Sequence, residues 1–214
     1  MPREPVIFAA MHTEAKAIRK GLGPEVPIRI IGIEGKKIPS PAELARPATI
    51  ILAGFAGALD PSLKVGDLVL DTSLPLPNVP FRRGTVYASR GLVATSDEKA
   101  ALFQSTGSLA VDMETAVVKA LADRLGVPFI GLRVISDTAE ESIDPRVLRF
   151  IDATGRVKPL ALAATLGASP SLLATLLRLG RSARIASRNL SEAMPVLWGA
   201  LRELESPIRS ASPA

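Results

Sequence analysis

Short runs of apolar residues alternate in the N-terminal part of the chain with stretches whose apolar residues recur every three or four positions. The first kind of pattern predicts buried strands, at residues 6–9, 28–33, 49–53, 67–71, 109–111 and 127–135. The second kind predicts amphipathic helices, at residues 13–22, 97–105 and 114–125. Strands that alternate with helices predict an α/β fold, in which helices flank a central, mixed and twisted sheet.

Cap and turn residues define several boundaries of these elements. Thr13 is expected to cap the helix that it begins, and Ser40, followed by proline, is expected to begin a short helix over residues 40–45. Gly126 is expected to end the helix before it. Glycines at residues 54–57 predict a turn after a strand. The remaining segments are a proline-rich loop and two weaker strands, at residues 74–83, 85–87 and 92–94.

The C-terminal part of the chain has mostly helical patterning. Residues 159–177 carry no charge, but Gly167, Ser169 and Pro170 interrupt them, so two helices joined by a turn are expected rather than a membrane span. We therefore expect an α/β core at residues 1–156, a helical C-terminal extension packed on it at residues 157–205, and a frayed tail at 206–214.

Composition excludes several kinds of chemistry. The chain has no cysteine and one histidine, His12, which excludes disulfides, thiolate zinc sites and a metal site of several histidines within one chain. We therefore expect no metal. The absence of cysteine and of an apolar signal sequence favours a cytoplasmic location. A net charge of +5 and an isoelectric point near 9.9 would suit binding to nucleic acid or to an anionic membrane.

Acidic residues follow three of the predicted strands. Glu14 follows the first strand, Asp112 and Glu114 follow the fifth, and Asp137 follows the last. Ligands of open α/β sheets bind beyond the carboxyl ends of strands, so these carboxylates could converge on one pocket. Each also has an ordinary structural explanation, because acidic residues are favoured in the first turns of helices and at their caps.

Four sequence blocks resemble the nucleoside phosphorylase/nucleosidase superfamily. They are AMHTE at 10–14, GFAGAL at 54–59 with LKVGD at 63–67, AVDMETA at 110–116, and LRVISD at 132–137. They follow the family's order and extend over residues 6–139. The segment 94–112 and the basic helix around 176–179 resemble the hopanoid-associated phosphorylase-like branch, whose members are adenosylhopane nucleosidases. Methylthioadenosine/S-adenosylhomocysteine nucleosidases are the second relative.

The resemblance implies a phosphorylase/hydrolase-like fold and a role for each matching residue. Asp137 would protonate the departing purine from a buried strand end beside other carboxylates, and Ser136 would support it. Glu14 would orient and deprotonate water. Glu114 would accept hydrogen bonds from the ribose hydroxyls. The other substrate-binding residues expected at the nucleoside are Asp112, Met113, Phe55, Gly54 and Gly57.

The nucleophile is expected to be water. Phosphorylases have a small hydroxyl residue where this chain has Phe55, and Glu14 would repel phosphate. Phosphorolysis is the alternative, and Arg82, Arg83 or Arg90 would then donate hydrogen bonds to the bound phosphate. Phe55 would also suit a hydrophobic 5′ substituent, such as that of a lipid-linked adenosine, although it could equally be a packing residue.

The resemblance also implies partners. The substrate would be a small-molecule nucleoside, without a cofactor, and the chain would form a homo-oligomer, either a dimer or a hexamer. A row of arginines could contact an anionic membrane surface or simply face solvent: Arg178, Arg181, Arg184 and Arg188.

Two other functions compete with an enzyme. A nucleoside- or nucleic-acid-binding module would suit the basic charge, but the sequence has no phosphate-binding glycine motif and few aromatic residues for base stacking, so we expect no nucleic acid. The second competing function is that of a superfamily member that binds nucleoside without turnover. His12 and Asp112 stand where nucleosidases often have glutamate, and this difference could alter activity.

Overall fold

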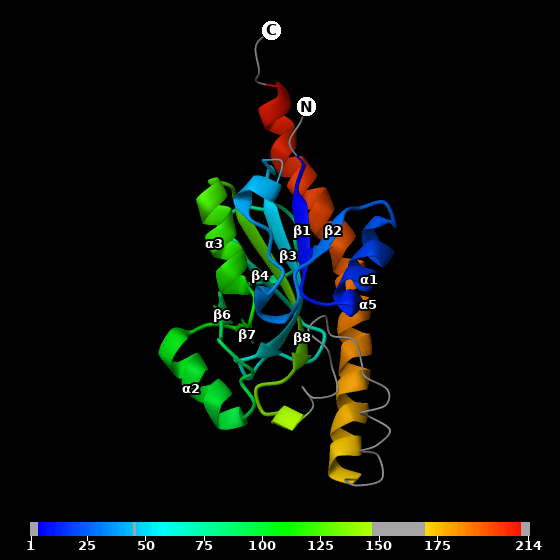
Figure 1. Cartoon of the computed structure of the whole chain (residues 1–214), viewed down its shortest axis with the longest axis vertical. Helices are drawn as coiled ribbons and strands as arrows, with labels where there is room; N and C mark the ends of the chain where they lie inside the picture. Colours follow the sequence, from blue (N-terminus) through cyan, green and yellow to red (C-terminus); the bar gives the residue numbers. More distant parts are fainter. Residues whose placement is uncertain (1–3, 45, 147–169, 211–214) are drawn as a thin grey trace.

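The computed structural model describes residues 4–44, 46–146 and 170–210 (Figure 1). Within these residues the strands are β1 (Val6–Ala9), β2 (Ile28–Ile30), β3 (Ile50–Ala58), β4 (Leu68–Asp71), β5 (Arg82–Arg83), β6 (Val86–Ala88), β7 (Ala110–Asp112) and β8 (Phe129–Asp137). The helices are α1 (His12–Leu22), α2 (Ser96–Thr106), α3 (Thr115–Leu125) and α5 (Pro170–Ser210), with short 3₁₀ turns η1 (Ile33–Gly35) and η2 (Pro41–Glu43).

The strands form one mixed sheet, as the sequence predicts, with β3 and β8 at its centre. Its order is β2-β1-β3-β8-β4-β5, and β7 pairs with both β3 and β6. Strands β1, β2, β3 and β8 run parallel, whereas β4 is antiparallel to β8. β7 runs antiparallel to the end of β3, where Gly57 pairs with Val111. The carboxyl ends of β1, β3 and β8 therefore meet β7 at one edge of the sheet, where ligands bind in open α/β folds.

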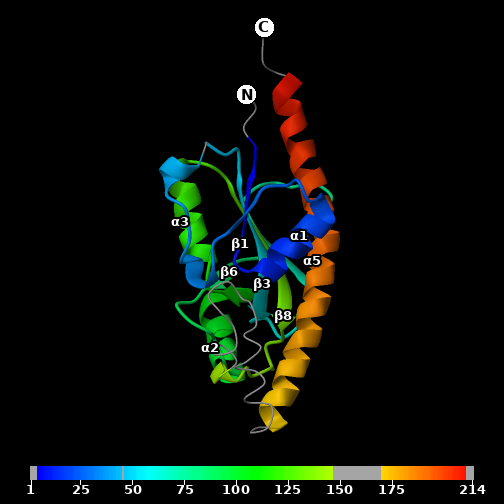
Figure 2. The ribbon, with the colours of Figure 1, turned by 45° about the vertical axis from the view of Figure 1, so that its right-hand side comes forward.

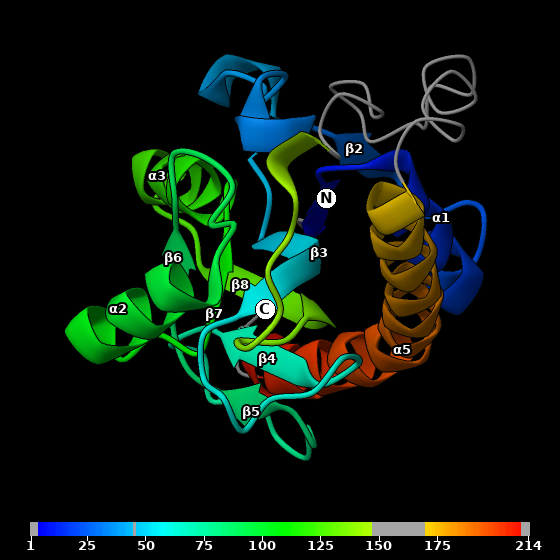
Figure 3. The ribbon, with the colours of Figure 1, turned by 90° about the horizontal axis from the view of Figure 1, so that it is seen from below.

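Helices cover both faces of the sheet (Figures 2 and 3). On one face α1 and α5 pack together, and their apolar side chains join Ile51 and Leu132 of the sheet in one core cluster. On the other face α3 packs Val118 and Leu121 against Leu52. Successive residues of β3 thus face opposite layers, and all except Phe55 and Gly57 are buried, which explains its unbroken apolar run.

The turn predicted at residues 54–57 is wrong, because β3 continues through these glycines to Ala58. A Cβ atom on Gly54 would lie 2.4 Å from Oε1 of Glu14 and 2.7 Å from Nη1 of Arg133. On Gly57 it would lie 2.9 Å from Oδ2 of Asp137. The glycines therefore make room for charged side chains beside an extended strand.

We expect Gly54→Ala to lower the free energy of unfolding by about 1–3 kcal/mol, because the added methyl group overpacks the space between Glu14 and Arg133. Gly199→Ala in helix α5 is the control, since no atom lies within 4 Å of its added Cβ. The control should raise the same free energy by about 0.5–1 kcal/mol. Urea unfolding measures both, and a neutral Gly54→Ala would contradict the packing argument.

Several other boundaries differ from the prediction. Helix α1 begins at His12 rather than Thr13, because the Glu14 carboxylate accepts from the backbone N–H of Met11, 2.8 Å away, and so caps the first turn. Residues 92–94 form no strand, whereas part of the predicted loop forms β5. Strand β8 includes Asp137, which was expected beyond its end.

The C-terminal helix α5 continues to Ser210, so residues 206–210 of the predicted tail are helical. Most of the segment expected to hold two helices and a turn, residues 159–169, lies outside the described residues, as does 211–214. In the part that the structure describes, no helix is long and apolar enough to cross a membrane.

Candidate active site

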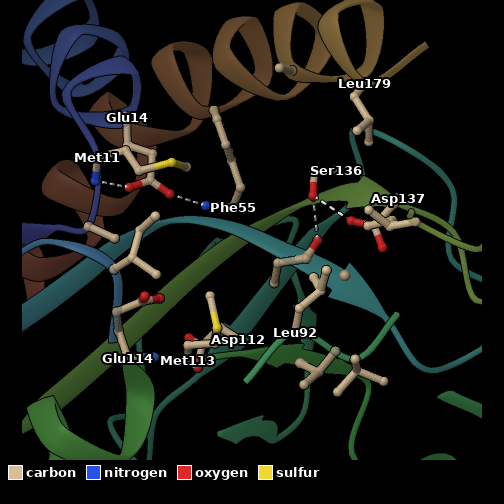
Figure 4. A pocket seen from close by; sticks show the side chains of 18 of the residues that line it. Met11, Glu14, Phe55, Leu92, Asp112, Met113, Glu114, Ser136, Asp137 and Leu179 are labelled. Carbon is tan, nitrogen blue, oxygen red and sulfur yellow. Dashed lines mark hydrogen bonds between the residues drawn. The ribbon is translucent and has the colours of Figure 1, made fainter. Parts of the chain in front are cut away.

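A cavity of about 330 Å³ lies at the sheet edge where β3, β7 and β8 end (Figure 4). The segments that follow β1 and β6 and the side of α5 complete its wall. Most of the predicted site residues line it: Glu14, Phe55, Gly57, Asp112, Met113, Glu114, Ser136 and Asp137. Gly54 does not, but it lies directly behind Glu14. The structure thus brings together carboxylates from three distant parts of the chain.

Glu14 lies at one end of this cavity and is 1% exposed. Its carboxylate accepts hydrogen bonds from the backbone N–H groups of Met11 and Phe55, both at 2.8 Å. Burial raises the pKa of Glu14 from 4.5 to about 7, although Arg133 and the Phe55 N–H oppose the shift. A carboxylate with a pKa near neutrality can exchange a proton with water at physiological pH, as a general base must.

Arg133 is the central charged residue of the site, and the sequence pattern does not predict its role. It lies in the middle of β8, is 0% exposed, and forms an ion pair with Asp112 and a longer one of 3.7 Å with Glu114. Burial alone would lower the pKa of Arg133, but Asp112, Glu114 and Glu14 raise it above its ordinary value. Among the described residues, its Nε and Nη1 atoms have no hydrogen-bond acceptor. A charged residue inside the apolar run 127–135 was the available signal, because buried charges need partners.

Asp112 and Glu114 share Arg133 but are bound differently. One oxygen of Asp112 accepts from the backbone N–H groups of Glu114 and Thr115, at 3.2 and 3.0 Å, and the other from the Thr115 hydroxyl and Arg133. Glu114 accepts from the backbone N–H of Glu34 at 2.9 Å, and burial raises its pKa. Asp112 therefore orders the start of α3 and balances Arg133, which leaves Glu114 as the better placed of the two to bind a ligand.

Asp137 lies at the other end of the cavity in Figure 4, apart from Glu14. Its Oδ1 lies 2.7 Å from the Ser136 hydroxyl, as expected of a supporting residue. The sequence predicts other carboxylates around Asp137, but the structure places a cation there instead. The ammonium group of Lys99, from α2, lies 2.6 Å from Oδ2 and is completely buried. A lysine near the start of a predicted helix gives no sequence signal of such a role.

The remaining wall of the cavity is mostly apolar. Phe55 and Met113 point into it, and Leu179 reaches it from α5 (Figure 4). Leu92 and Ile143 complete this part of the wall. The helical extension therefore contributes to the cavity, and an apolar group of a ligand would be in contact with it.

No lysine or arginine is among the described residues that line the cavity. The arginines that could have bound phosphate lie elsewhere. Arg82 donates to Asp60 at 2.5 Å, and Arg83 donates to the carbonyl of Leu74 at 2.9 Å. Arg90 is exposed and is not part of the wall. Within the described residues, no group of three or more acidic, histidine or cysteine side chains could hold a metal ion.

The pKa of Glu14 predicts a pH profile. If Glu14 must be ionised to act as a base, kcat/KM for a substrate should fall about tenfold per pH unit below an apparent pKa of about 7. The rate should become constant about one to two pH units above that value, because the carboxylate is then almost fully ionised. A profile centred near 4.5, the ordinary value for glutamate, would contradict this role.

Known proteins are similar to this chain in sequence and in fold. The sequence profile of the Phosphorylase superfamily matches residues 72–166. The chain is 26% identical to a 5′-methylthioadenosine/S-adenosylhomocysteine nucleosidase of Geobacillus thermodenitrificans, in an alignment that covers 52% of this chain and 64% of that protein. The chain thus matches slightly less than two-thirds of this relative's length.

Solved structures share the fold over nearly the whole chain. The 5′-methylthioadenosine/S-adenosylhomocysteine nucleosidase of Helicobacter pylori superimposes with a TM-score of 0.59 and 17% identity, covering 96% of this chain and 98% of that one. The futalosine hydrolase of the same organism gives a TM-score of 0.57 and 19% identity, covering 91% and 98%. The expected phosphorylase/hydrolase-like architecture is therefore confirmed.

Proposed function

We propose that this chain, which is similar to the Phosphorylase superfamily over residues 72–166 and to a nucleosidase, hydrolyses the N-glycosidic bond of a purine nucleoside. One observation carries the proposal. Two carboxylates that can act on opposite ends of this bond, Glu14 and Asp137, face one cavity, and Glu114 lies on the Glu14 side of it. The buried Arg133 balances the acidic charge at the Glu14 end, so the cavity can remain acidic without excessive repulsion.

Each carboxylate has a distinct task in this reaction. Glu14 takes a proton from water, whose oxygen attacks the sugar carbon that was bonded to the purine. Glu114 accepts hydrogen bonds from the ribose hydroxyls. Asp137 faces the leaving group, where a proton is needed because a purine anion leaves poorly. Met113 packs on the sugar, and positive charge that develops on the sugar is stabilised by the surrounding carboxylates.

Water is the proposed nucleophile rather than phosphate. The described wall of the cavity offers no basic side chain to a phosphate dianion, and a Glu14 carboxylate would repel it. Phe55 occupies the position where phosphorylases have a small hydroxyl residue, and only its backbone N–H donates, to Glu14. Phosphorolysis is the alternative outcome of the test below.

The proposed substrate is a 5′-substituted adenosine. The relatives include nucleosidases named for 5′-methylthioadenosine and S-adenosylhomocysteine, and both of these compounds carry a thioether on the 5′ carbon of the ribose. The apolar wall formed by Phe55, Leu92 and Leu179 suits a larger hydrophobic group, including the lipid of adenosylhopane.

The test is to incubate the protein with adenosine, 5′-methylthioadenosine and an adenosine with a long 5′-alkyl group, with and without phosphate. We expect adenine and a free sugar in every case, with kcat/KM rising with the 5′ group, and no dependence on phosphate. A sugar 1-phosphate would indicate a phosphorylase. Glu14→Gln serves as the inactive reference in this assay. If the wild-type protein binds nucleoside but releases no more adenine than this variant, it is a binding module or a non-catalytic relative.

Contact with a membrane is a second proposal, favoured by the surface of α5. Leu177 and Ile185 are 57% and 47% exposed, and the exposed Arg181 and Arg184 lie beside them. Arg178 instead pairs with Glu141 at 3.3 Å, and Arg188 with Glu192 at 2.9 Å. Arg181→Gln/Arg184→Gln should weaken binding to anionic vesicles, and unchanged binding would contradict the proposal.

The resemblance further supports a cytoplasmic homo-oligomer, a dimer or a hexamer. Light scattering of the purified chain would test the oligomeric state, and a monomer at micromolar concentration would contradict it.

A further inference from the structure

Lys99 is a completely buried lysine whose ammonium group lies beside one end of the cavity. Its Nζ donates to Oδ2 of Asp137 at 2.6 Å, to the carbonyl of Thr138 at 2.7 Å and to the carbonyl of Glu141 at 2.9 Å. An ammonium group has three protons, so every one of them has an acceptor. Lys99 does not itself line the cavity, whereas Asp137 does.

Only one of these three acceptors can accept a proton as well as a hydrogen bond. The two carbonyl groups belong to the backbone, but Asp137 is a carboxylate. If Lys99 gives up that one proton, its two remaining N–H groups can stay on the carbonyls, and its lone pair then faces Asp137. The geometry therefore defines a single path for a proton from Lys99, and that path ends at the cavity.

We propose that Lys99 supplies, through Asp137, the proton that the departing purine needs. This inference rests on the proposed function. In the resting state Lys99 is an ammonium ion and Asp137 a carboxylate. During cleavage an Nζ–H bond breaks as Asp137 takes the proton, and Asp137 gives a proton to a purine ring nitrogen. The electron pair of the broken C–N bond goes to the purine.

The charges balance along this path. The Lys99–Asp137 pair goes from neutral to a net charge of −1 while the sugar gains positive charge, so each change favours the other. Glu14 takes the proton lost by the attacking water and releases it to solvent. The Lys99–Asp137 pair regains one proton from solvent after the products leave, so that one water molecule is consumed overall.

A purely structural role is the competing interpretation. Lys99 also anchors the segment after β8 through its hydrogen bonds to the carbonyls of Thr138 and Glu141. Arg178 of α5 holds the same segment through an ion pair with Glu141 and a hydrogen bond of 3.1 Å to the carbonyl of Ser142. Loss of this anchor would affect every substrate alike. Loss of a proton source would affect only substrates whose leaving group needs a proton.

The experiment compares two substrates with the same sugar, 5′-methylthioadenosine and 4-nitrophenyl 5-methylthio-β-ribofuranoside, whose nitrophenolate leaves without a proton. Lys99→Gln and Lys99→Arg both keep N–H donors but cannot supply the proton, and their different sizes guard against a variant that does not fold. Lys119→Met is the matched control, because it breaks the Lys119–Asp71 ion pair of 2.8 Å away from the cavity.

Both Lys99 variants should lower kcat for methylthioadenosine by about 10²–10⁴-fold, the usual contribution of a general acid, and kcat for the nitrophenyl glycoside by less than about fivefold. The ratio of the two rates cancels partial loss of folded protein. Equal losses on both substrates, or a Lys99→Arg variant with nearly normal methylthioadenosine cleavage, would overturn the role of Lys99 alone. A wild-type protein that releases no adenine from any nucleoside would overturn the proposed function.

Discussion

Replacing Arg133 with methionine is expected to lower the free energy of unfolding by about 3–5 kcal/mol, because it leaves the buried Asp112, Glu114 and Glu14 carboxylates without their cation. The side chain is 0% exposed, so water cannot replace the lost charge. Activity should fall as well, because without Arg133 the pKa of Glu14 would rise further above 7, and less of the base would be ionised.

Urea unfolding at several pH values measures this effect. Burial raises the folded-state pKa of Glu14 and Glu114 above the unfolded value, so ionising them costs stability as the pH rises through that range. The decrease in the free energy of unfolding caused by Arg133→Met should therefore be larger at pH 8 than at pH 5. Arg82→Met is the control, because Arg82 is 45% exposed and its pair with Asp60 should contribute only about 0–1 kcal/mol. Equal losses in the two variants would contradict the argument.

Replacing Asp137 with asparagine is expected to lower kcat for purine nucleosides by about 10²–10⁴-fold. The amide keeps the shape of the side chain but cannot pass a proton to the purine. KM should change much less, because the sugar and the apolar wall of the cavity keep their contacts. Adenine release under saturating substrate measures kcat.

Ser136→Ala is the graded comparison for Asp137→Asn. It removes one hydrogen bond of 2.7 Å to Asp137 but keeps the carboxylate and its pair with Lys99. We expect a loss of about 10–100-fold, as for one hydrogen bond to a charged group. Because Asp137→Asn leaves the ammonium of Lys99 without its counterion, thermal unfolding must accompany the assay. An Asp137→Asn protein that is folded and cleaves nucleosides at the wild-type rate would exclude Asp137 from the reaction.

The sequence alone was sufficient for the fold class and for the acidic residues of the candidate site. Apolar runs at 6–9 and 127–135 match β1 and most of β8, since a strand buried on both faces must be apolar at nearly every position. The acids Glu14, Glu114 and Asp137 could be grouped because strand ends in this kind of sheet meet at one edge. These features depend on local pattern and on topology, and both are encoded along the chain.

The partners of these acids depended on contacts between residues far apart in sequence, and only the tertiary structure gave them. Lys99 is 38 positions from Asp137, and it looks like an ordinary surface residue of a helix until the fold brings its ammonium group to Asp137 at the end of β8. Arg133 interrupts an apolar strand, but its three carboxylate neighbours come from separate elements. Glycines in a sequence favour a turn, which is why one was expected in this part of β3. The space that these glycines leave is filled by side chains of α1 and β8, which the local sequence does not show. Charge compensation and close packing are properties of the assembled fold, so no local pattern could have specified them.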